Sequence, residues 1–99
     1  DTIVNFLGGL IGNYDLIDFT NITGINATSG VPAWDGNIGS GGNLSAHSVA
    51  YLESGGNTIV VANTTDFTET PDASGVGADI AIILIGVDLG LVNANFHHT

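Results

Sequence analysis

The chain has 99 residues, with ten Asp and Glu, no Lys or Arg, and a formal net charge of -10. A chain of this length forms a single domain, residues 1–99, and without basic side chains it lacks the positive surface that binds nucleic acid. The absence of cysteine excludes disulfides, thiolate metal sites and a cysteine nucleophile.

The negative charge predicts the medium in which the protein works. Ten carboxylates on one small domain repel each other unless cations collect on them. Hard divalent cations prefer carboxylate and carbonyl oxygens. We therefore expect calcium or a salt-rich medium around this protein.

The chain begins at Asp1, and no signal-peptide pattern follows, which predicts a fragment or a processed product of a longer chain. The longest apolar run, residues 80–87, lies between two aspartates. It is far shorter than the ~20 residues of a membrane-spanning helix. We expect this run to form a buried strand, and we expect no membrane span.

The composition favours an all-β fold. Gly and Asn are abundant, whereas Lys, Arg, Gln and Met, which favour helices, are absent. The sequence predicts a small β-sandwich or a β-roll cap with a C-terminal antiparallel meander. In chain order, the first strands are expected at residues 2–7 and 14–19, with a glycine stretch between them. Residues 20–44 predict a long loop with one short strand or helical turn.

The second half of the chain predicts a β-hairpin and a third strand. Residues 47–53 and 58–64 alternate in the manner of strands and flank the sequence SGGN, whose residues tolerate positive φ. An acidic loop follows at residues 64–79. The apolar run 80–87 is expected to pair antiparallel with the second hairpin strand, which completes a three-stranded meander. Residues 89–96 are expected to form an edge strand or a helical turn.

The stretch GGLIGNYDLIDF, residues 8–19, allows three interpretations. A phosphate-binding loop needs a lysine after its glycines and a helix behind them, so a chain without lysine excludes it. The spacing of Gly8, Gly9, Gly12, Asp15 and Ile17 is similar to a calcium-binding nonapeptide turn with extra residues, in which carbonyls and a carboxylate face the cation. A glycine bend that joins two strands is the simpler alternative, and both remain open.

Four carboxylates crowd the acidic loop, at Asp66, Glu69, Asp72 and Asp79. With the help of backbone carbonyls, they supply many of the about six to eight oxygens that calcium takes. Their spacing lacks the alternating pattern of an EF-hand. The two alternatives are a calcium site at this loop and an acidic loop that faces solvent.

The histidines and hydroxyl groups show no catalytic arrangement. His47 stands at a strand start, and His97 with His98 is expected to form an exposed tail. Neighbours in a strand point to opposite faces, so this terminal pair does not share one metal. No Ser, His and Asp occur in a nucleophile-elbow context. We therefore expect no enzymatic activity.

Trp34 is the single tryptophan, and its indole has two alternative roles. It packs in the core, or it stacks on a sugar ring as in carbohydrate-binding modules. A module of that kind would use Trp34 together with Tyr51.

The chain also contains N-x-S/T sequons, which are glycosylation acceptors only in a eukaryotic secretory pathway. In a chain so rich in Asn and Thr, we expect them to be chance matches. They begin at Asn21, Asn26, Asn43 and Asn63.

Several short motifs occur in an order that resembles one known family. The chain opens with D-x-I, continues with D-x-I-D-F, carries a GGNT turn in the hairpin, and then has D-x-x-I-x-L-x-G-V. In this order the motifs resemble the C-terminal domains of type I-secreted repeats-in-toxin (RTX) proteins, including those that follow the calcium β-roll of serralysin-like metalloproteases. The likeness leaves residues 27–46 unmatched, and no complete nonapeptide repeat of the β-roll is present. The matching residues are Asp1, Ile3, Asp15, Ile17, Asp18, Gly55, Gly56, Thr58, Asp79, Ile82, Leu84, Gly86 and Val87.

The resemblance implies a non-catalytic domain, extracellular or at the cell surface, that is the C-terminal cap and the type I secretion and folding region of a larger secreted protein. Its implied partners are the parent polypeptide and a type I exporter, and its implied ion is Ca2+. Repulsion among carboxylates would keep the chain loose for export, and calcium outside the cell would convert ligand binding into folding energy. The expected calcium ligands are Asp15, Asp18, Asp66, Glu69, Asp72 and Asp79.

A second hypothesis, from another class, is a structural or accessory subunit of an extracellular filament or larger complex. Such a subunit would form a homo-oligomer or hetero-oligomer through exposed strand edges. No edge lysine blocks this pairing, because the chain has no lysine.

Overall fold

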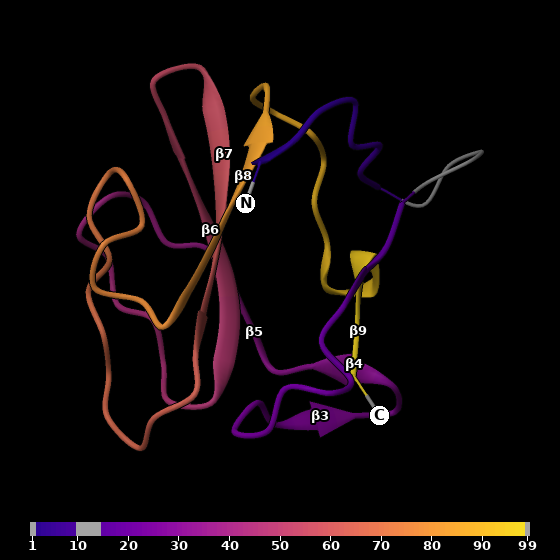
Figure 1. Cartoon of the computed structure of the whole chain (residues 1–99), viewed down its shortest axis with the longest axis vertical. Coiled ribbons are helices and arrows are strands. Elements are labelled where there is room, and N and C mark those ends of the chain that lie inside the picture. Colours follow the sequence, from indigo (N-terminus) through magenta and orange to yellow (C-terminus); the bar gives the residue numbers. More distant parts are fainter. Residues whose placement is uncertain (1, 10–14, 99) are drawn as a thin grey trace.

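The computed structural model describes residues 2–9 and 15–98, and this part of the chain is built on a five-stranded sheet in the order β1-β8-β7-β6-β5 (Figure 1). The prediction of an all-β fold is confirmed. The strands of the sheet are β1 (Thr2–Ile3), β5 (Trp34–Asn37), β6 (Ser48–Ser54), β7 (Asn57–Asn63) and β8 (Ile80–Ile85). Two short ladders accompany it, formed by β2 (Ile17–Asp18) with β9 (Phe96–His97) and by β3 (Ala27–Thr28) with β4 (Val31–Pro32).

The hairpin of β6 and β7 forms the centre of the sheet, and its register runs from Ser48 opposite Asn63 to Ser54 opposite Asn57. Gly55 and Gly56 make the turn with φ angles of 60° and 81°. Glycine adopts such angles without steric cost, and this geometry matches the twist of a two-residue hairpin. The predicted hairpin is confirmed, with each strand one residue closer to the turn than predicted.

β8 pairs antiparallel with β7 along its whole length, from Ile80 opposite Ala62 to Ile85 opposite Asn57. The predicted meander is therefore confirmed. The strand ends at Ile85 rather than at residue 87, because Gly86 has a φ of 112° that leaves the extended conformation.

Side chains alternate along the three long strands and give the sheet two apolar faces. On the first face, Val49, Val60 and Leu84 are buried beneath segments from both ends of the chain, which we call the terminal cover. On the second face, Leu52 and Val61 are buried beneath residues 38–46 and the acidic loop, which we call the loop cover. Figure 1 shows the two covers on opposite sides of the sheet. The buried apolar residues of the terminal cover are Phe6, Phe19, Ile25, Leu91 and Phe96.

The N-terminal strands are shorter than predicted. Only Thr2–Ile3 of the predicted strand 2–7 is extended, because Asn5 has a φ of 59°. β1 also pairs in parallel with β8, far away in sequence, rather than with the next strand along the chain. The predicted strand 14–19 is reduced to Ile17–Asp18, and residue 14 lies outside the described residues.

Residues 20–44 are more ordered than the predicted loop, and the prediction of one short strand or helical turn is wrong. They contain β3, β4 and β5. Ser29 and Gly30, both with positive φ, form the turn between β3 and β4. β5 pairs in parallel with β6 despite its polar sequence WDGN, because Trp34 packs against the first core while Asp35 and Asn37 are exposed.

The C-terminal segment contains both of its predicted alternatives. η1 (Asn93–Asn95) is a short helical turn, and β9 follows it as an edge strand paired with β2. Within residues 2–9 and 15–98, no helix has the length and the apolar character needed to cross a membrane.

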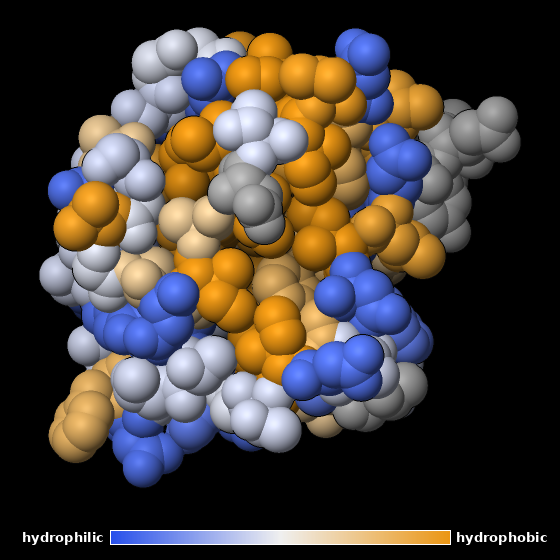
Figure 2. Space-filling view, viewed as in Figure 1, coloured by the Kyte–Doolittle hydropathy of each residue, from blue (hydrophilic) through white to orange (hydrophobic). Residues whose placement is uncertain are grey.

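Exposed apolar side chains gather beyond the ends of the parallel strands β1 and β8. Of the eight large apolar side chains that are exposed in the described part, six lie on residues 4–16 and 85–92. These segments adjoin, because β1 pairs with β8 and because Asp15 hydrogen-bonds to Leu7. Figure 2 shows apolar side chains from the top of the molecule down the middle of the viewed face. We call this surface the apolar end: Val4, Leu7, Leu16, Ile85, Val87 and Val92.

Candidate functional site

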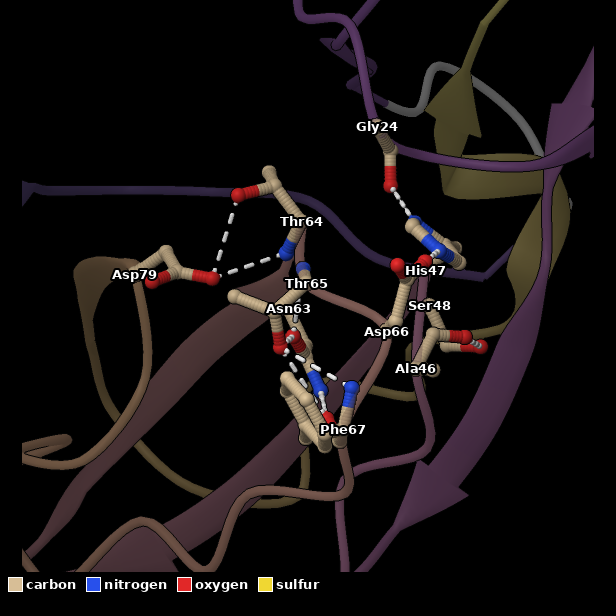
Figure 3. A network of polar contacts seen from close by, with 10 residues as sticks. All are labelled: Gly24, Ala46, His47, Ser48, Asn63, Thr64, Thr65, Asp66, Phe67 and Asp79. Atoms are coloured by element: carbon tan, nitrogen blue, oxygen red, sulfur yellow. Dashed lines mark hydrogen bonds and ion pairs between the residues drawn. The ribbon is translucent and has the colours of Figure 1, made fainter.

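The acidic loop, residues 64–79, is fastened at its start by Asn63, which has no exposed surface (Figure 3). The Asn63 amide nitrogen donates to the carbonyl oxygens of Leu44 and Phe67, at 3.2 and 2.6 Å. Its amide oxygen accepts from the backbone N–H and the hydroxyl of Thr65, at 2.8 and 2.7 Å. One buried amide thus joins the loop to the end of β7 and to the other segment of the loop cover.

Two predicted calcium ligands lie beside this anchor. The Asp79 carboxylate accepts hydrogen bonds from the backbone N–H and the hydroxyl of Thr64, at 2.8 and 3.1 Å (Figure 3). This contact ties the end of the acidic loop to its start. The Asp66 carboxylate instead lies 2.6 Å from Nε2 of His47, so Asp66 ties the loop to the segment before β6.

His47 is engaged at both ring nitrogens. Nδ1 lies 2.6 Å from the carbonyl oxygen of Gly24, and Nε2 lies 2.6 Å from the Asp66 carboxylate (Figure 3). Both partners are acceptors, and only a protonated imidazole donates from both nitrogens at once. The hydrogen bond to Asp66, followed by the one to Gly24, raises the pKa of His47 above its ordinary value. When it is protonated, His47 is a cationic partner for Asp66 in a chain without Lys or Arg.

Glu69 and Asp79 are the two predicted ligands that the fold brings together. Partial burial raises the pKa of Glu69, and the negative charge of Asp79 raises it further. The Oε1 atom of Glu69 is buried and has no hydrogen-bond partner among the residues that the structure describes. The Glu69 backbone is fixed by two hydrogen bonds to Leu44, at 2.8 and 3.0 Å. A hydrogen bond between the Glu69 and Asp79 side chains, which forms when Glu69 is protonated, also raises the pKa of Glu69. When both groups are ionised, they repel each other at a position that the backbone holds in place.

Asp72 closes a turn within the acidic loop. Its Oδ1 accepts from the backbone N–H and the hydroxyl of Ser74, at 2.9 and 2.8 Å, and from the backbone N–H of Val76, at 3.1 Å. The hydroxyl of Ser74 contributes most to lowering the pKa of Asp72. This carboxylate has a structural role that needs no metal ion.

Asp15 and Asp18 belong to the terminal cover, on the other side of the sheet from the acidic loop. The Asp15 carboxylate accepts from the backbone N–H of Leu7 at 2.9 Å. The Asp18 carboxylate accepts from the backbone N–H of Thr20 at 2.8 Å, and contacts with Thr20 lower the pKa of Asp18. The Asp18 carboxylate stabilises a local turn, and the Asp15 carboxylate fastens residue 15 to residue 7.

The glycine stretch is held by Asn95, a fully buried residue that the sequence analysis does not identify. Its side chain accepts from the backbone N–H of Gly9 at 3.1 Å and donates to the carbonyl oxygens of Gly9 and Asp15, at 2.9 and 3.3 Å. A Cβ at Gly8 would lie 2.1 Å from the carbonyl oxygen of Leu89, so packing requires glycine there. These contacts pair Gly9 and Asp15 with protein groups. Residues 10–14, which include Gly12, lie outside the described residues, so both the glycine bend and the calcium turn stay open.

The predicted ligands are thus spread over both covers. Within residues 2–9 and 15–98, no three acidic or histidine side chains converge into a group that could hold a metal ion. Calcium binding stays a prediction. Among the predicted ligands, Glu69 and Asp79 are the pair that the fold brings together.

Trp34 lies against the first core. Its ring is stacked on Tyr51 at 5.7 Å between centroids, and it lies 4.9 Å from the ring of Phe96. Partial burial, with the negative charges of Glu53 and Asp88, raises the pKa of Tyr51. These contacts favour the core-packing role of Trp34 over the sugar-stacking role.

The prediction of an exposed histidine tail is wrong for His98, which is only 8% exposed. Its Nε2 lies 2.8 Å from the carbonyl oxygen of Ile22, and its backbone N–H donates to Gly30 at 3.0 Å. The reason is the pairing of β9 with β2, which carries the end of the chain onto the terminal cover. His97 is half-buried in the same ladder.

Comparison with known proteins finds no matching family model, no similar curated protein and no similar solved structure. The resemblance to the C-terminal domains of RTX proteins therefore stays a prediction from the sequence motifs.

Proposed function

We propose that this protein is a non-catalytic, extracellular β-domain that caps a larger secreted protein and that folds with the help of calcium. In a cytosol poor in calcium, carboxylate repulsion would keep the domain loose enough for a type I exporter. Outside the cell, millimolar calcium would bind only the folded form and would stabilise it by mass action.

The contact between Glu69 and Asp79 is the observation that carries this proposal. Two carboxyl groups meet there, and the Glu69 pKa is raised by burial and by the charge of Asp79. The chain has no Lys or Arg that would offset such repulsion. A divalent cation between the two groups would replace repulsion with attraction, and carbonyl oxygens of the loop could complete its shell.

Thermal unfolding with and without calcium tests the proposal. At a calcium concentration ten times Kd, binding to the folded state alone adds about 1.4 kcal/mol. For a domain of this size, that corresponds to a rise in Tm of about 6–11 °C. Glu69→Gln should abolish the rise, whereas the matched control Glu53→Gln, which removes the same charge on β6, should keep it. Identical Tm values in excess chelator and in millimolar calcium would refute the calcium part of the proposal.

The apolar end supports the role of a cap. A contiguous exposed apolar surface on a small domain marks contact with another protein or domain. Val4, at 64% exposed, and Leu7, at 54%, lie on the first segment of the chain, and Ile85 and Val87 lie at the end of the neighbouring β8. Another part of the larger protein would cover this surface.

A structural or accessory subunit is the second candidate, and the open edge of β8 favours it. Among the described residues, β1 pairs with Ile83 and Leu84 of this six-residue strand, so other chains could add to the edge beside Ile80 and Ala81. Light scattering at increasing protein concentration tests this candidate. Only monomers at the highest concentration would exclude self-assembly.

A further inference from the structure

The apolar end is a continuous surface rather than a set of scattered side chains. Val4 comes directly after β1, Ile85 is the last residue of β8, and these two strands pair in parallel. Leu7 is joined to Asp15, the residue before Leu16, by two hydrogen bonds of 2.8 and 2.9 Å. Exposed apolar side chains from distant parts of the chain therefore adjoin, as they do where a small domain contacts another protein.

Three carboxylates border this surface, and we call them the acidic rim: Asp15, Glu53 and Asp88. Asp15 is exposed, and its carboxylate accepts from the backbone N–H of Leu7 at 2.9 Å. Asp88 is exposed directly after Val87, and its backbone N–H donates to the Glu53 carboxylate at 2.6 Å. Figure 2 shows hydrophilic side chains beside the apolar ones at the top of the viewed face.

The acidic rim has no lysine or arginine partner within its own domain, because the chain contains neither residue. A partner that covers the apolar end would take water away from these carboxylates. That loss of hydration is unfavourable unless the partner brings opposite charges or hydrogen-bond donors. The surface is therefore complementary to one that is apolar at its centre and positively charged at its edge.

We propose that the apolar end binds a polypeptide surface with an apolar centre and a rim of Lys or Arg. This inference rests on the proposed function, in which another part of the larger protein covers the apolar end. The affinity comes mainly from the apolar end, whose side chains are 38–64% exposed and leave water on binding. The acidic rim sets the orientation of the partner and the rate of association.

Charge argues against two other occupants. A second copy of the chain brings a second acidic rim and no Lys or Arg, so it would double the carboxylates around one interface. An anionic lipid surface attracts basic segments, whereas this chain has a net charge of -10.

A short synthetic amphipathic peptide of leucine and lysine, whose leucines form one face of a helix, is the probe. It is added to the whole chain during two-dimensional 1H–15N NMR. The control peptide has glutamate in place of every lysine. We expect saturable shifts at the apolar end with the lysine peptide, and an affinity at least about tenfold higher than with the glutamate peptide.

Matched variants locate the binding surface. Leu7→Asn combined with Leu16→Asn removes apolar surface at similar side-chain size, and should weaken binding by about tenfold or more. Phe67→Asn, the control, removes a side chain that is 77% exposed on the acidic loop, and should leave binding unchanged. Asp88→Asn should weaken binding by about threefold and reduce its salt dependence. Asp35→Asn, on β5 at the opposite edge of the sheet from β1, should do neither.

Equal affinities for the two peptides, or an unchanged affinity in the double leucine variant, would overturn the inference. Self-association of the peptide-free chain, or binding to phosphatidylglycerol vesicles, would also overturn it if the leucine substitutions abolish it. Calcium-dependent Tm is measured on the same proteins without peptide. A failure of this inference and a failure of the calcium proposal are therefore distinguishable.

Discussion

Replacing Asn63 with alanine should detach the start of the acidic loop from the sheet. Asn63→Ala removes four hydrogen bonds from a side chain with no exposed surface. At about 1 kcal/mol each, these bonds contribute about 4 kcal/mol. In the variant, the Leu44 carbonyl still accepts a hydrogen bond from the backbone N–H of Glu69, and the Phe67 carbonyl still accepts one from the hydroxyl of Thr65. Neither carbonyl oxygen is therefore left without a hydrogen bond. We therefore expect a loss nearer to about 3 kcal/mol, or about 12–24 °C in Tm.

Thermal unfolding followed by circular dichroism measures this loss, and Asn43→Ala is the matched control. Asn43 also begins an N-x-S/T sequon, but it is exposed. A surface change of this kind usually costs less than about 0.5 kcal/mol. Limited proteolysis should cut the acidic loop of Asn63→Ala at temperatures where the control is intact. Equal Tm values for the two variants would refute the assignment of Asn63 as the anchor of the loop.

The other predictions concern ionisable groups in the same loop. Because the pKa of His47 is raised in the folded state, protonated His47 stabilises the fold fully below about pH 6.5, and this stabilisation is lost as pH rises through the folded-state pKa. Asp66→Asn should therefore reduce the fall in Tm at alkaline pH. An unchanged dependence of Tm on pH in this variant would contradict the prediction. Because the pKa of Asp72 is lowered in the folded state, its ionised carboxylate stabilises the fold above about pH 3.8, and this stabilisation is lost on acidification. Asp72→Ala should therefore weaken the fall in Tm at acid pH. A Tm that is lower by the same amount at every pH would argue against this link between the pKa and stability. The raised pKa of Glu69 disfavours its ionised form in the folded state, so Glu69→Gln should raise Tm at neutral pH without calcium; a lower Tm there would show that Asp79 does not repel it.

The sequence was sufficient for the local part of the fold. The hairpin and β8 follow from alternation within short segments and from Gly55 and Gly56, whose backbone angles fit a tight turn. The pairing of β1 with β8 joins residues about 80 positions apart, and no local pattern encodes such a contact. β5 was missed because only Trp34 of its four residues carries an apolar side chain, which packs on the first core.

The candidate site could be predicted by residue type but not by arrangement. The sequence identifies the carboxylates of the acidic loop. It does not show that Asp66 pairs with His47, or that Asp72 accepts hydrogen bonds from Ser74 within the loop. The buried amides of Asn63 and Asn95 gave no signal, because Asn is common throughout this chain and is usually a surface residue. Only three-dimensional packing distinguishes these two from the exposed asparagines.

Two-dimensional 1H–15N NMR during a calcium titration tests the central claim most directly. The account predicts saturable shifts that are concentrated in the acidic loop around Glu69 and Asp79, at millimolar calcium or below, and that are absent in Glu69→Gln. Spectra that stay unchanged through the same range of calcium, or that shift equally in Glu69→Gln, would contradict it.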